Sequence, residues 1–355
     1  MQIVITGGAG FLGVRLARTL LAQGALSLAG APAVPITALR LVDRAPPPPD
    51  LAQHPLVQVQ EGDLVDLLEQ HPECVVPAGT AAVVHLASAV SGECEADFDL
   101  GLRSNLRAGM LLLERCRAAG RQQPPVFVFS SSLAVFGRDP YATGAHDLAP
   151  VITDTTLPTP QGSYGTQKFV LEQLVADYTR KGFIRGRSVR LMTVSVRPGK
   201  PNGAASGFMS GLIREPLAGQ RSTCPVPPDT PVALASPVRS MEGLLAALQA
   251  SEAAWGSRTA MNLPALTTTP AEMVAALERV AGPAPVRLID WEVDPAVAQI
   301  VQSWPARFDT QRAQALGLQA DPDFDSIVRA YLQELAPDQD RGQGQGRCQG
   351  GEQRS

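Results

Sequence analysis

A glycine-rich turn near the start of the chain constrains the fold more than any other feature. The apolar run Gln2–Thr6 leads directly into GGAGFLG (residues 7–13), and the helix-period segment Phe11–Gln23 follows, closed by Gly24. Glycines let the backbone turn sharply and approach a phosphate, while the free N–H groups of a helix N-terminus attract its charge. This order predicts a site for the pyrophosphate of a dinucleotide, formed by Gly7, Gly10, Phe11, Leu12 and Gly13.

The first half of the chain alternates short apolar, β-branched runs with helix-period segments. This pattern is typical of a parallel sheet that is covered by helices on both faces. Because strand–helix–strand units connect right-handedly, we expect an α/β fold with a Rossmann-type, doubly wound parallel sheet. Residues 27–35 read as a loop insertion. Further strands are expected at residues 39–42, 57–60, 82–86, 126–130 and 190–197, and the clearest helices at 100–119 and 164–181.

The second half has a different character. Residues 198–237 are rich in proline and glycine and lose their periodicity, which indicates loops around a cleft. Helices are expected at residues 241–250, at 270–281 after a capping Thr269, and at 324–335, with a strand at 259–263. We therefore expect a nucleotide-binding domain of residues 1–198 and 233–263, a smaller, discontinuous C-terminal substrate-binding domain of residues 199–232 and 264–336, and a disordered tail of residues 337–355.

Composition narrows the partners. With 45% hydrophobic residues and a formal charge of -4, the chain has no basic face for nucleic acid and no polybasic membrane patch. It contains no uncharged apolar stretch of about 18 residues and no signal-peptide pattern at its start, so we expect a cytoplasmic protein. The five cysteines and four histidines are scattered without ligand spacing, and neither a disulfide framework nor a metal site is expected.

Two carboxylates follow the expected second and third strands. Asp43 would accept hydrogen bonds from the adenosine ribose and repel a 2′-phosphate, which favours NAD over NADP, although the neighbouring Arg44 would suit a 2′-phosphate. Asp63 either binds the adenine amino group or caps the next helix.

Tyr164 and Lys168 are four residues apart on an expected helix and so share one face. Tyrosine ordinarily ionises near pH ~10, and a neighbouring ammonium and the positive nicotinamide ring would both lower that pKa. A serine of the run Ser130–Ser132, at the carboxyl end of the expected fifth strand, would hydrogen-bond the reacting oxygen. These residues predict general acid–base catalysis of a hydride transfer to or from a nicotinamide dinucleotide.

At this point a family resemblance becomes evident. The segments TGGAGFLG (6–13), HLAS (85–88), SSSLAVFG (130–137), YGTQK (164–168) and RPG (197–199), with Asp63 and Asn105, resemble the extended short-chain dehydrogenase/reductase superfamily over residues 1–335. The resemblance implies that Ser132 is the catalytic hydroxyl, Tyr164 the acid/base and Lys168 a ligand of the nicotinamide ribose. Phe136 stands where the family usually has tyrosine. Further implied cofactor contacts are Leu64, Leu86, Ala87, Ser88 and Asn105.

Other segments indicate which member this is. Leu133-Ala134 stands where related dehydratases carry an Asp-Glu pair, so dehydration is not expected. The chain resembles the D-erythronate dehydrogenase subfamily, which implies NAD-dependent oxidation of C2 of D-erythronate or a related sugar acid to the 2-oxo acid. A nucleotide-sugar 4-epimerase and a non-catalytic NAD-binding sensor stay open as alternatives. The subfamily resemblance rests on SGECEADFDLG (91–101), RPGKPNGAAS (197–206), REPLAGQ (214–220), CPVPPDTPV (224–232), MNLPALT (261–267) and SWPARFD (303–309).

A sugar-acid substrate requires a cation for its carboxylate. Arg197, Lys200, Arg214 and Arg239 are the candidates, and the sequence does not rank them. Ser88 would contact either cofactor or substrate. The superfamily resemblance also implies a homodimer packed through the helices at 100–119 and 164–181.

Overall fold

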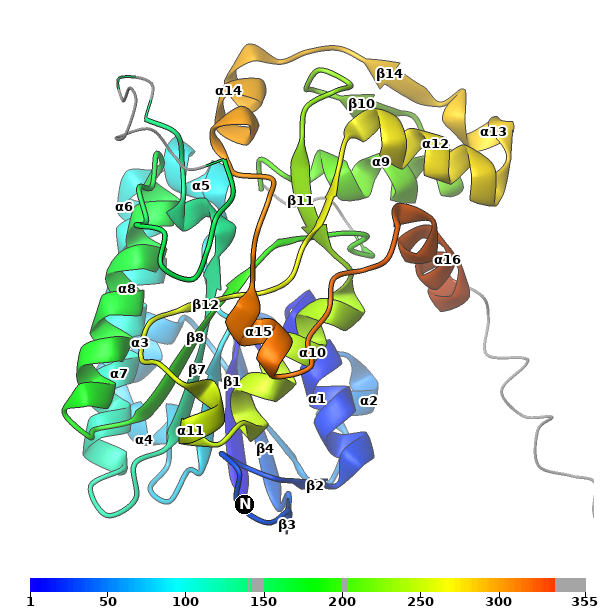
Figure 1. The fold of residues 1–355 in the computed structure, drawn as a ribbon. Coiled ribbons are helices and arrows are strands. Elements are labelled where there is room, and N and C mark those ends of the chain that lie inside the picture. The colour runs from blue at the N-terminus through cyan, green and yellow to red at the C-terminus, as the bar shows by residue number, and fades with distance from the viewer. Residues whose placement is uncertain (140, 142–149, 200–203, 336–355) are drawn as a thin grey trace, which may run out of the picture.

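The computed structural model describes residues 1–139, 141, 150–199 and 204–335 (Figure 1). A large parallel sheet with its helices forms the lower part of the view, and a smaller lobe of helices and short strands lies above it. Lys200 and the tail expected at residues 337–355 lie outside the described residues.

The main sheet has seven strands in the order β12-β8-β7-β6-β1-β4-β5, and all neighbours run parallel. This arrangement confirms the predicted Rossmann-type fold. The strand order reverses between β1 and β6, and such a point opens a crevice at the carboxyl ends of the strands. The strands are β1 (Gln2–Thr6), β4 (Ala38–Asp43), β5 (Val57–Glu61), β6 (Ala82–His85), β7 (Val126–Ser132), β8 (Arg185–Leu191) and β12 (Met261–Asn262).

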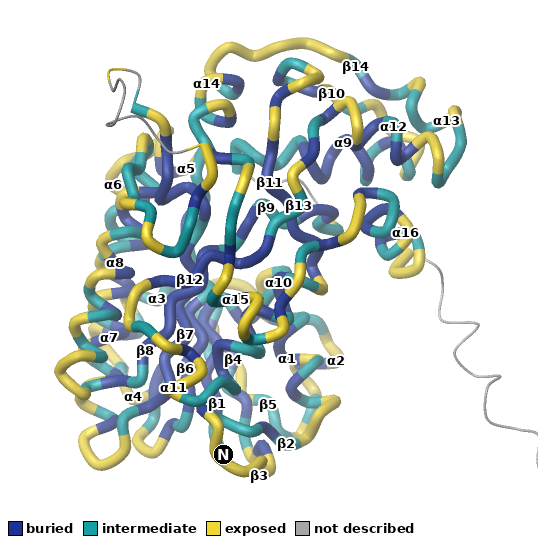
Figure 2. The backbone as a smooth tube through the Cα atoms, in the orientation of Figure 1, coloured by how far each residue is buried: buried dark blue, intermediate teal, exposed yellow. Residues whose placement is uncertain are grey.

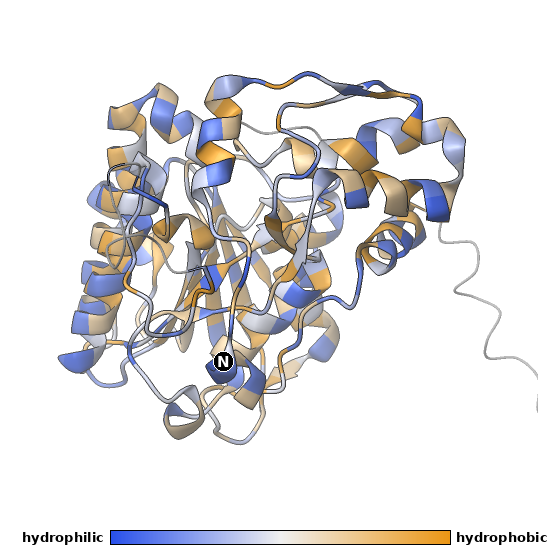
Figure 3. Cartoon of the chain, turned by 45° about the horizontal axis from the view of Figure 1, so that its top comes forward, coloured by the Kyte–Doolittle hydropathy of each residue, from blue (hydrophilic) through white to orange (hydrophobic). Residues whose placement is uncertain are grey.

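Helices cover both faces of this sheet (Figure 1). The short α5 (Ser91–Ala96), α6 (Phe98–Gly101) and the π-helical turn η1 (Leu102–Arg107) precede α7. The outer helices carry both apolar and polar residues (Figure 3), as expected of elements that bury one side. One face carries α1 (Phe11–Gln23), α2 (Pro49–Ala52), α10 (Pro237–Gln249) and α11 (Glu252–Trp255); the other carries α3 (Leu64–Gln70), α4 (Pro72–Val75), α7 (Ala108–Ala119) and α8 (Ser163–Arg180).

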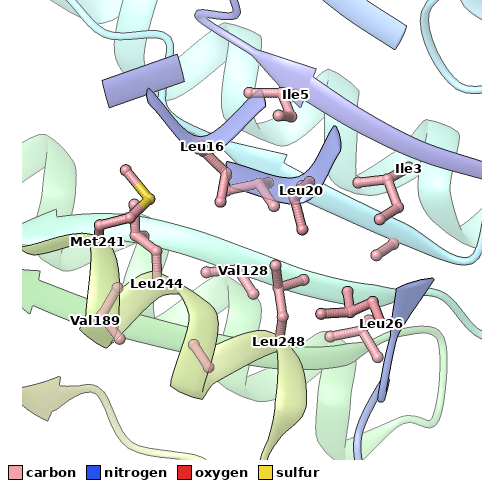
Figure 4. Packing of buried hydrophobic residues seen from close by; sticks show 14 of the residues in the cluster. Ile3, Ile5, Leu16, Leu20, Leu26, Val128, Val189, Met241, Leu244 and Leu248 are labelled. Atoms are coloured by element: carbon pink, nitrogen blue, oxygen red, sulfur yellow. The ribbon is translucent and has the colours of Figure 1, made fainter. Parts of the chain in front are cut away.

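The main core lies between β1, α1 and α10. Figure 4 shows Leu16 and Leu20 of α1 facing Leu244 and Leu248 of α10. Helix α1 ends where expected, because Gly24 adopts a left-handed conformation and its N–H bonds to the Leu20 carbonyl oxygen at 3.0 Å. The central strands β1, β6 and β7 are almost wholly buried (Figure 2), whereas the edge strand β5 is largely exposed. The first strand and the first helix therefore have the bounds that the sequence predicted.

A second, separate core holds the upper lobe together. It includes Val196 and Leu234, and then residues from Met273 to Tyr331. We propose that the two cores correspond to the two expected domains, with two exceptions. Val196 and Leu234 of the expected nucleotide-binding domain belong to the second core, and residues 313–318 pack against the first core. The elements of this part are β9 (Thr193–Val194), α9 (Phe208–Leu217), β10 (Ser222–Cys224), β11 (Val232–Ala235), β13 (Leu266–Thr268), α12 (Pro270–Ala281), α13 (Pro283–Val286), β14 (Ile289–Trp291), α14 (Pro295–Ser303), α15 (Gln311–Ala315) and α16 (Phe324–Leu335).

The structure corrects three expectations. The strand expected at 190–197 begins at Arg185 and ends at Leu191, because Arg187 is buried against the Ala247 carbonyl oxygen (2.6 Å) and Glu252 (3.2 Å) rather than exposed. The supposed loop insertion at residues 27–35 ends in a short strand, β3 (Val34–Pro35), which pairs antiparallel with β2 (Ala25–Leu26) just before it. The region 198–237, expected to be loops, contains the helix α9 and the strands β10 and β11.

Candidate active site

A pocket of about 410 Å³ lies at the carboxyl ends of the central strands. Strand ends at the reversal point are where this architecture places ligands. The pocket is lined by most of the residues that the sequence singled out: Gly7, Gly10, Phe11, Leu12, Gly13, Asp43, Asp63, Leu64, Leu86, Ala87, Ser88, Ser132, Tyr164, Lys168 and Arg197. The predicted cofactor and catalytic residues are thus brought together, with Asn105 just behind them.

The glycine turn is packed so tightly that side chains would not fit. A Cβ on Gly7, whose φ is +73°, would lie 2.7 Å from the Ala87 backbone nitrogen, and one on Gly13 would lie 2.1 Å from the Gly7 carbonyl oxygen. The N-cap of α1 is Gly10, which has no side chain to satisfy the N–H groups of the first turn. These groups are therefore available to an anion in the pocket.

Asp43 holds the glycine turn against the end of β4. Its Oδ2 accepts a hydrogen bond from the Ala9 backbone N–H (3.0 Å), and its Oδ1 accepts one from the Arg44 N–H (2.7 Å). Arg44 also lines the pocket, with an exposed side chain. The carboxylate is thus fixed at the pocket wall.

Asp63 caps α3. Its Oδ1 accepts hydrogen bonds from the Val65 N–H (3.0 Å) and from Arg103 Nη2 (2.9 Å). Asp63 therefore serves as the helix cap, one of the two roles that the sequence left open. It also lines the pocket, where the other role, binding the adenine amino group, would be carried out.

The catalytic helix approaches β7 closely. A Cβ on Gly165 would lie 2.0 Å from the Ala134 carbonyl oxygen, so only glycine allows α8 to pack this near the turn that follows Ser132. Lys168, on the next turn of α8, donates a hydrogen bond from Nζ to the Ser130 carbonyl oxygen. Tyr164, Lys168 and Ser132 therefore share the pocket because of one close helix–strand contact.

The charges at this site differ from the sequence-based expectation. Desolvation raises the pKa of Tyr164 to about 12, although hydrogen bonding to Ser132 and the charge of Arg197 act to lower it. Burial likewise lowers the pKa of Lys168 to about 7. The tyrosine pKa is therefore raised rather than lowered as expected, because the pocket disfavours the charged form of both groups.

Asn105 lies behind the pocket rather than in its wall. Its Oδ1 accepts hydrogen bonds from Ser88 Oγ (3.0 Å) and the Ala89 N–H (2.8 Å), and its Nδ2 donates to Gln167 Oε1 (2.7 Å). The residue belongs to η1, and such π-helical turns often re-aim a side chain at a functional site. Asn105 connects the loop after β6 to the residue that precedes Lys168.

Of the four cations considered for a carboxylate, Arg197 lines the pocket. No carboxylate within the described ranges pairs with its guanidinium, whose pKa is lowered by burial and by the charge of Arg214. Arg214 instead bonds to the Arg197 carbonyl oxygen (2.8 Å) and Glu215 (2.6 Å), and Arg239 bonds to Glu242 (2.8 Å). Neither of these two lines the pocket.

Comparison with known proteins decides the family. The pattern of the NAD dependent epimerase/dehydratase family matches residues 3–232. The chain belongs to this family. The predicted superfamily resemblance is thereby confirmed, and the cofactor of the family is NAD.

Two members of the NAD dependent epimerase/dehydratase family are similar over almost the whole chain. The D-erythronate dehydrogenase of Cupriavidus necator is 48% identical, with 94% of this chain and 98% of that protein covered. The D-erythronate dehydrogenase of Haemophilus influenzae is 40% identical, with 94% and 99% covered. Among solved structures, the nucleoside-diphosphate-sugar epimerase from Agrobacterium tumefaciens is 36% identical with a TM-score of 0.83, and the match covers 94% of each chain.

Sequence reasoning missed part of the pocket wall. Thr193, Val194, Ser206 and Trp304 line the pocket, yet no role was assigned to them. Trp304 lies in the SWPARFD segment that carried the subfamily resemblance, which was the one signal available for it. In the part of the chain that the structure describes, no helix is long and apolar enough to cross a bilayer. No group of three or more His, Cys, Asp or Glu side chains in those same ranges could hold a metal ion.

Proposed function

We propose that the protein is an NAD-dependent dehydrogenase that oxidises the C2 hydroxyl of a small sugar acid to the 2-oxo acid. D-erythronate is the substrate that we propose first. The 48% identity to a D-erythronate dehydrogenase over nearly the full chain carries this proposal. A pocket that joins Tyr164, Lys168 and Ser132 with the cation of Arg197 supports it, because a sugar acid presents both a hydroxyl group and a carboxylate.

The residues of the pocket fit NAD. The glycine cradle and the uncapped N-terminus of α1 suit the pyrophosphate, and the Asp43 carboxylate suits the ribose hydroxyls while disfavouring a 2′-phosphate. Asp63, Leu64 and the stretch Leu86–Ser88 complete the cofactor contacts that we assign, with Asn105 supporting them from behind. When bound, NAD supplies the hydride acceptor and a positive ring.

The chain's own residues manage the proton and the substrate. Tyr164 reacts as the phenolate, which the charge of Arg197 and the positive ring of bound NAD would favour, and in this form accepts the proton of the C2 hydroxyl. Ser132 donates a hydrogen bond to the oxygen as it becomes a carbonyl. Lys168 keeps a dissociable positive charge beside the tyrosine ring, at 5.4 Å from its centre. Arg197 binds the carboxylate, and the same charge favours the phenolate of Tyr164.

Assays that monitor NADH test this function directly. We expect NADH to form from D-erythronate in stoichiometric amount with NAD, and much more slowly with NADP. Absence of turnover across four- to six-carbon sugar acids would favour the NAD-binding sensor.

A nucleotide-sugar 4-epimerase is the second candidate, favoured by the 36% identity to the Agrobacterium tumefaciens epimerase. An epimerase returns its hydride to the sugar and therefore releases no net NADH. Interconversion of UDP-sugars without NADH release, measured by chromatography of the nucleotide sugars, would establish this reading in place of ours.

We further propose a homodimer that forms through α7 and α8 in the cytoplasm. Met110 on α7 and Val170 on α8 are 47% and 38% exposed, and such apolar side chains on two packed helices suit an interface. Sedimentation velocity tests the assembly, and Met110→Glu should shift it to monomers. The requirement for NAD, a cofactor of the cell interior, supports the location.

A further inference from the structure

We propose that Trp304 sets the largest substrate that the pocket accepts, an inference that rests on the proposed oxidation of a small sugar acid. Trp304 lines the pocket together with Ser132 and Tyr164. Among the pocket residues that the structure describes, it is the one that comes from beyond residue 206. Its indole is the contribution of the C-terminal third of the chain to the pocket wall.

Trp304 packs against two apolar clusters. It contacts the second core, to which Val301 of α14 also belongs. It also packs against the small cluster of Leu133, Met192, Ala233 and Ala235. Leu133 directly follows Ser132, so this cluster lies at the catalytic end of the pocket rather than at its glycine-rich end. Trp304 therefore lies between the second core and the cluster next to Ser132, in the same pocket as Tyr164.

The backbone on both sides of the indole is fixed. The Ser303 carbonyl oxygen accepts a hydrogen bond from the Arg138 N–H at 2.9 Å, and the Ala306 carbonyl oxygen accepts one from Thr267 Oγ1 at 2.6 Å. Beyond it, Ile152 bonds to Arg307 and Asp309 at 2.9 and 2.8 Å. Figure 1 shows this segment running from α14 down to α15, beside the sheet. The backbone that carries Trp304 is thus held in place, and the movement of its indole is limited by the packing against the two clusters.

An anchored aromatic wall discriminates by size. Arg197 and Trp304 line the same pocket as Ser132 and Tyr164. With the carboxylate of the acid held by Arg197 and C2 at Tyr164, we place the far end of the carbon chain against Trp304. A four-carbon acid leaves the indole in place, whereas a longer chain, or a nucleotide joined to the sugar, must displace it. Displacement of the indole would break its packing against both apolar clusters. The protein therefore selects small acids.

Trp304→Ala and Trp304→Phe test the proposal, with Trp291→Ala as the control because Trp291 is 42% exposed and does not line the pocket. The measured quantity is the ratio of kcat/KM for six-carbon to that for four-carbon sugar acids at saturating NAD. We expect Trp304→Ala to raise this ratio by about tenfold or more, the discrimination typical of one or two methylenes in an apolar pocket. Trp304→Phe should raise it less, and Trp291→Ala not at all, while the KM for NAD stays as in wild type.

The outcomes separate this inference from the proposed function. Absence of turnover of any sugar acid by wild type overturns the proposed function. Turnover by wild type with an unchanged ratio in both Trp304 variants overturns the role of Trp304 alone. Should Trp304→Ala fail to fold, as judged by circular dichroism, Trp304→Phe and Trp304→Leu decide the matter by the same ratio.

Discussion

Lys168 donates a hydrogen bond of 2.9 Å from Nζ to the carbonyl oxygen of Ser130, on the strand that ends at Ser132. The same nitrogen lies 5.0 Å from the centre of the Phe129 ring and 5.4 Å from that of Tyr164. Strand β7 therefore fixes the lysine, and the lysine lies over the tyrosine. Lys168 thus connects the strand that ends at Ser132 to the helix turn that carries Tyr164.

Tyr164→Phe should reduce kcat by about 10²- to 10⁴-fold, because it removes the group that accepts the substrate proton. NAD binding, measured by calorimetry, should change little, since the ring stays in place. Tyr178→Phe is the matched control: Tyr178 lies on the same helix, bonds to Glu114 and does not line the pocket. Undiminished turnover by Tyr164→Phe would refute the proposed acid/base.

Arg197→Met should raise the KM for the sugar acid by about 10- to 100-fold, the effect of losing hydrogen bonds to a charged partner. The KM for NAD should be nearly unchanged. Arg239→Met provides the control, because Arg239 pairs with Glu242 outside the pocket. If both variants affect the acid equally, the carboxylate is bound elsewhere.

Asp43→Asn should weaken NAD binding by about tenfold and narrow the preference for NAD over NADP, because the carboxylate both accepts from the ribose and repels a 2′-phosphate. Arg44 stays beside the site to receive that phosphate. The ratio of kcat/KM for the two cofactors is the measurement, and Asp50→Asn, on the exposed ion pair with Arg18, is the control. An unchanged ratio would remove Asp43 from cofactor selection.

The lowered pKa of Lys168 should make the free energy of unfolding depend on pH. Burial lowers its pKa from 10.5 to about 7, so between these values the unfolded chain holds a proton that the folded chain has released. The free energy of unfolding then rises with pH, by at most about 1.4 kcal/mol per pH unit, and below pH ~7 the folded protein carries the desolvated charge in full.

Lys168→Met removes this charge. Its gain in stability over wild type should therefore be largest below pH ~7 and shrink as the pH rises, as urea unfolding at about pH 6 and about pH 9 can measure. Lys181→Met, at an exposed position, should show no such trend. A pH-independent difference would mean that Lys168 is not perturbed.

The bounds of α1, α12 and α16 match the sequence-based expectation, because periodicity and capping residues are local signals. The start of β8 could not be found in the same way. Arg187 looks like a surface residue until Glu252 of α11 is brought beside it, and that pairing depends on the tertiary fold. A charged residue can be assigned to a buried strand only when the group that pairs with its charge is known.

The residues of the site likewise divide into those with a local sequence signal and those whose position depends on the tertiary fold. Residues at the ends of the strands were found because the order of strands alone dictates that their carboxyl ends meet. Asn105 and its partner Gln167 meet through a π-helical turn, which has no reliable sequence signal. Trp304 reaches the pocket because it packs against Leu133 and Met192, which are far from it in the sequence, and no local pattern contains that contact.

The buried ion pair of Glu172 and Arg190 leads to a prediction about stability. Glu172 binds Arg190 through two hydrogen bonds, from Nε at 2.9 Å and from Nη2 at 2.7 Å, and both residues are buried. Glu172→Met leaves the buried guanidinium without its counter-charge and should cost about 3–5 kcal/mol of unfolding free energy.

The double variant Glu172→Met/Arg190→Met should cost less than Glu172→Met alone, since no uncompensated charge stays behind. Asp177→Asn, in an exposed pair with Arg180 on the same helix, should change stability by about 0.5 kcal/mol or less. Denaturant unfolding gives all three values, and equal costs for the buried and the exposed substitution would contradict this account.

The second core draws on two separated stretches, with α10 between them packed on the first core. A cut within α10 would therefore divide the second core and also expose the apolar residues of the first core that α10 covers. Exchange of substrate lobes between relatives, by recombination or in the laboratory, must replace both stretches and the Trp304 segment together. New specificity in such a scaffold is accordingly easier to reach by altering single side chains than by exchanging modules.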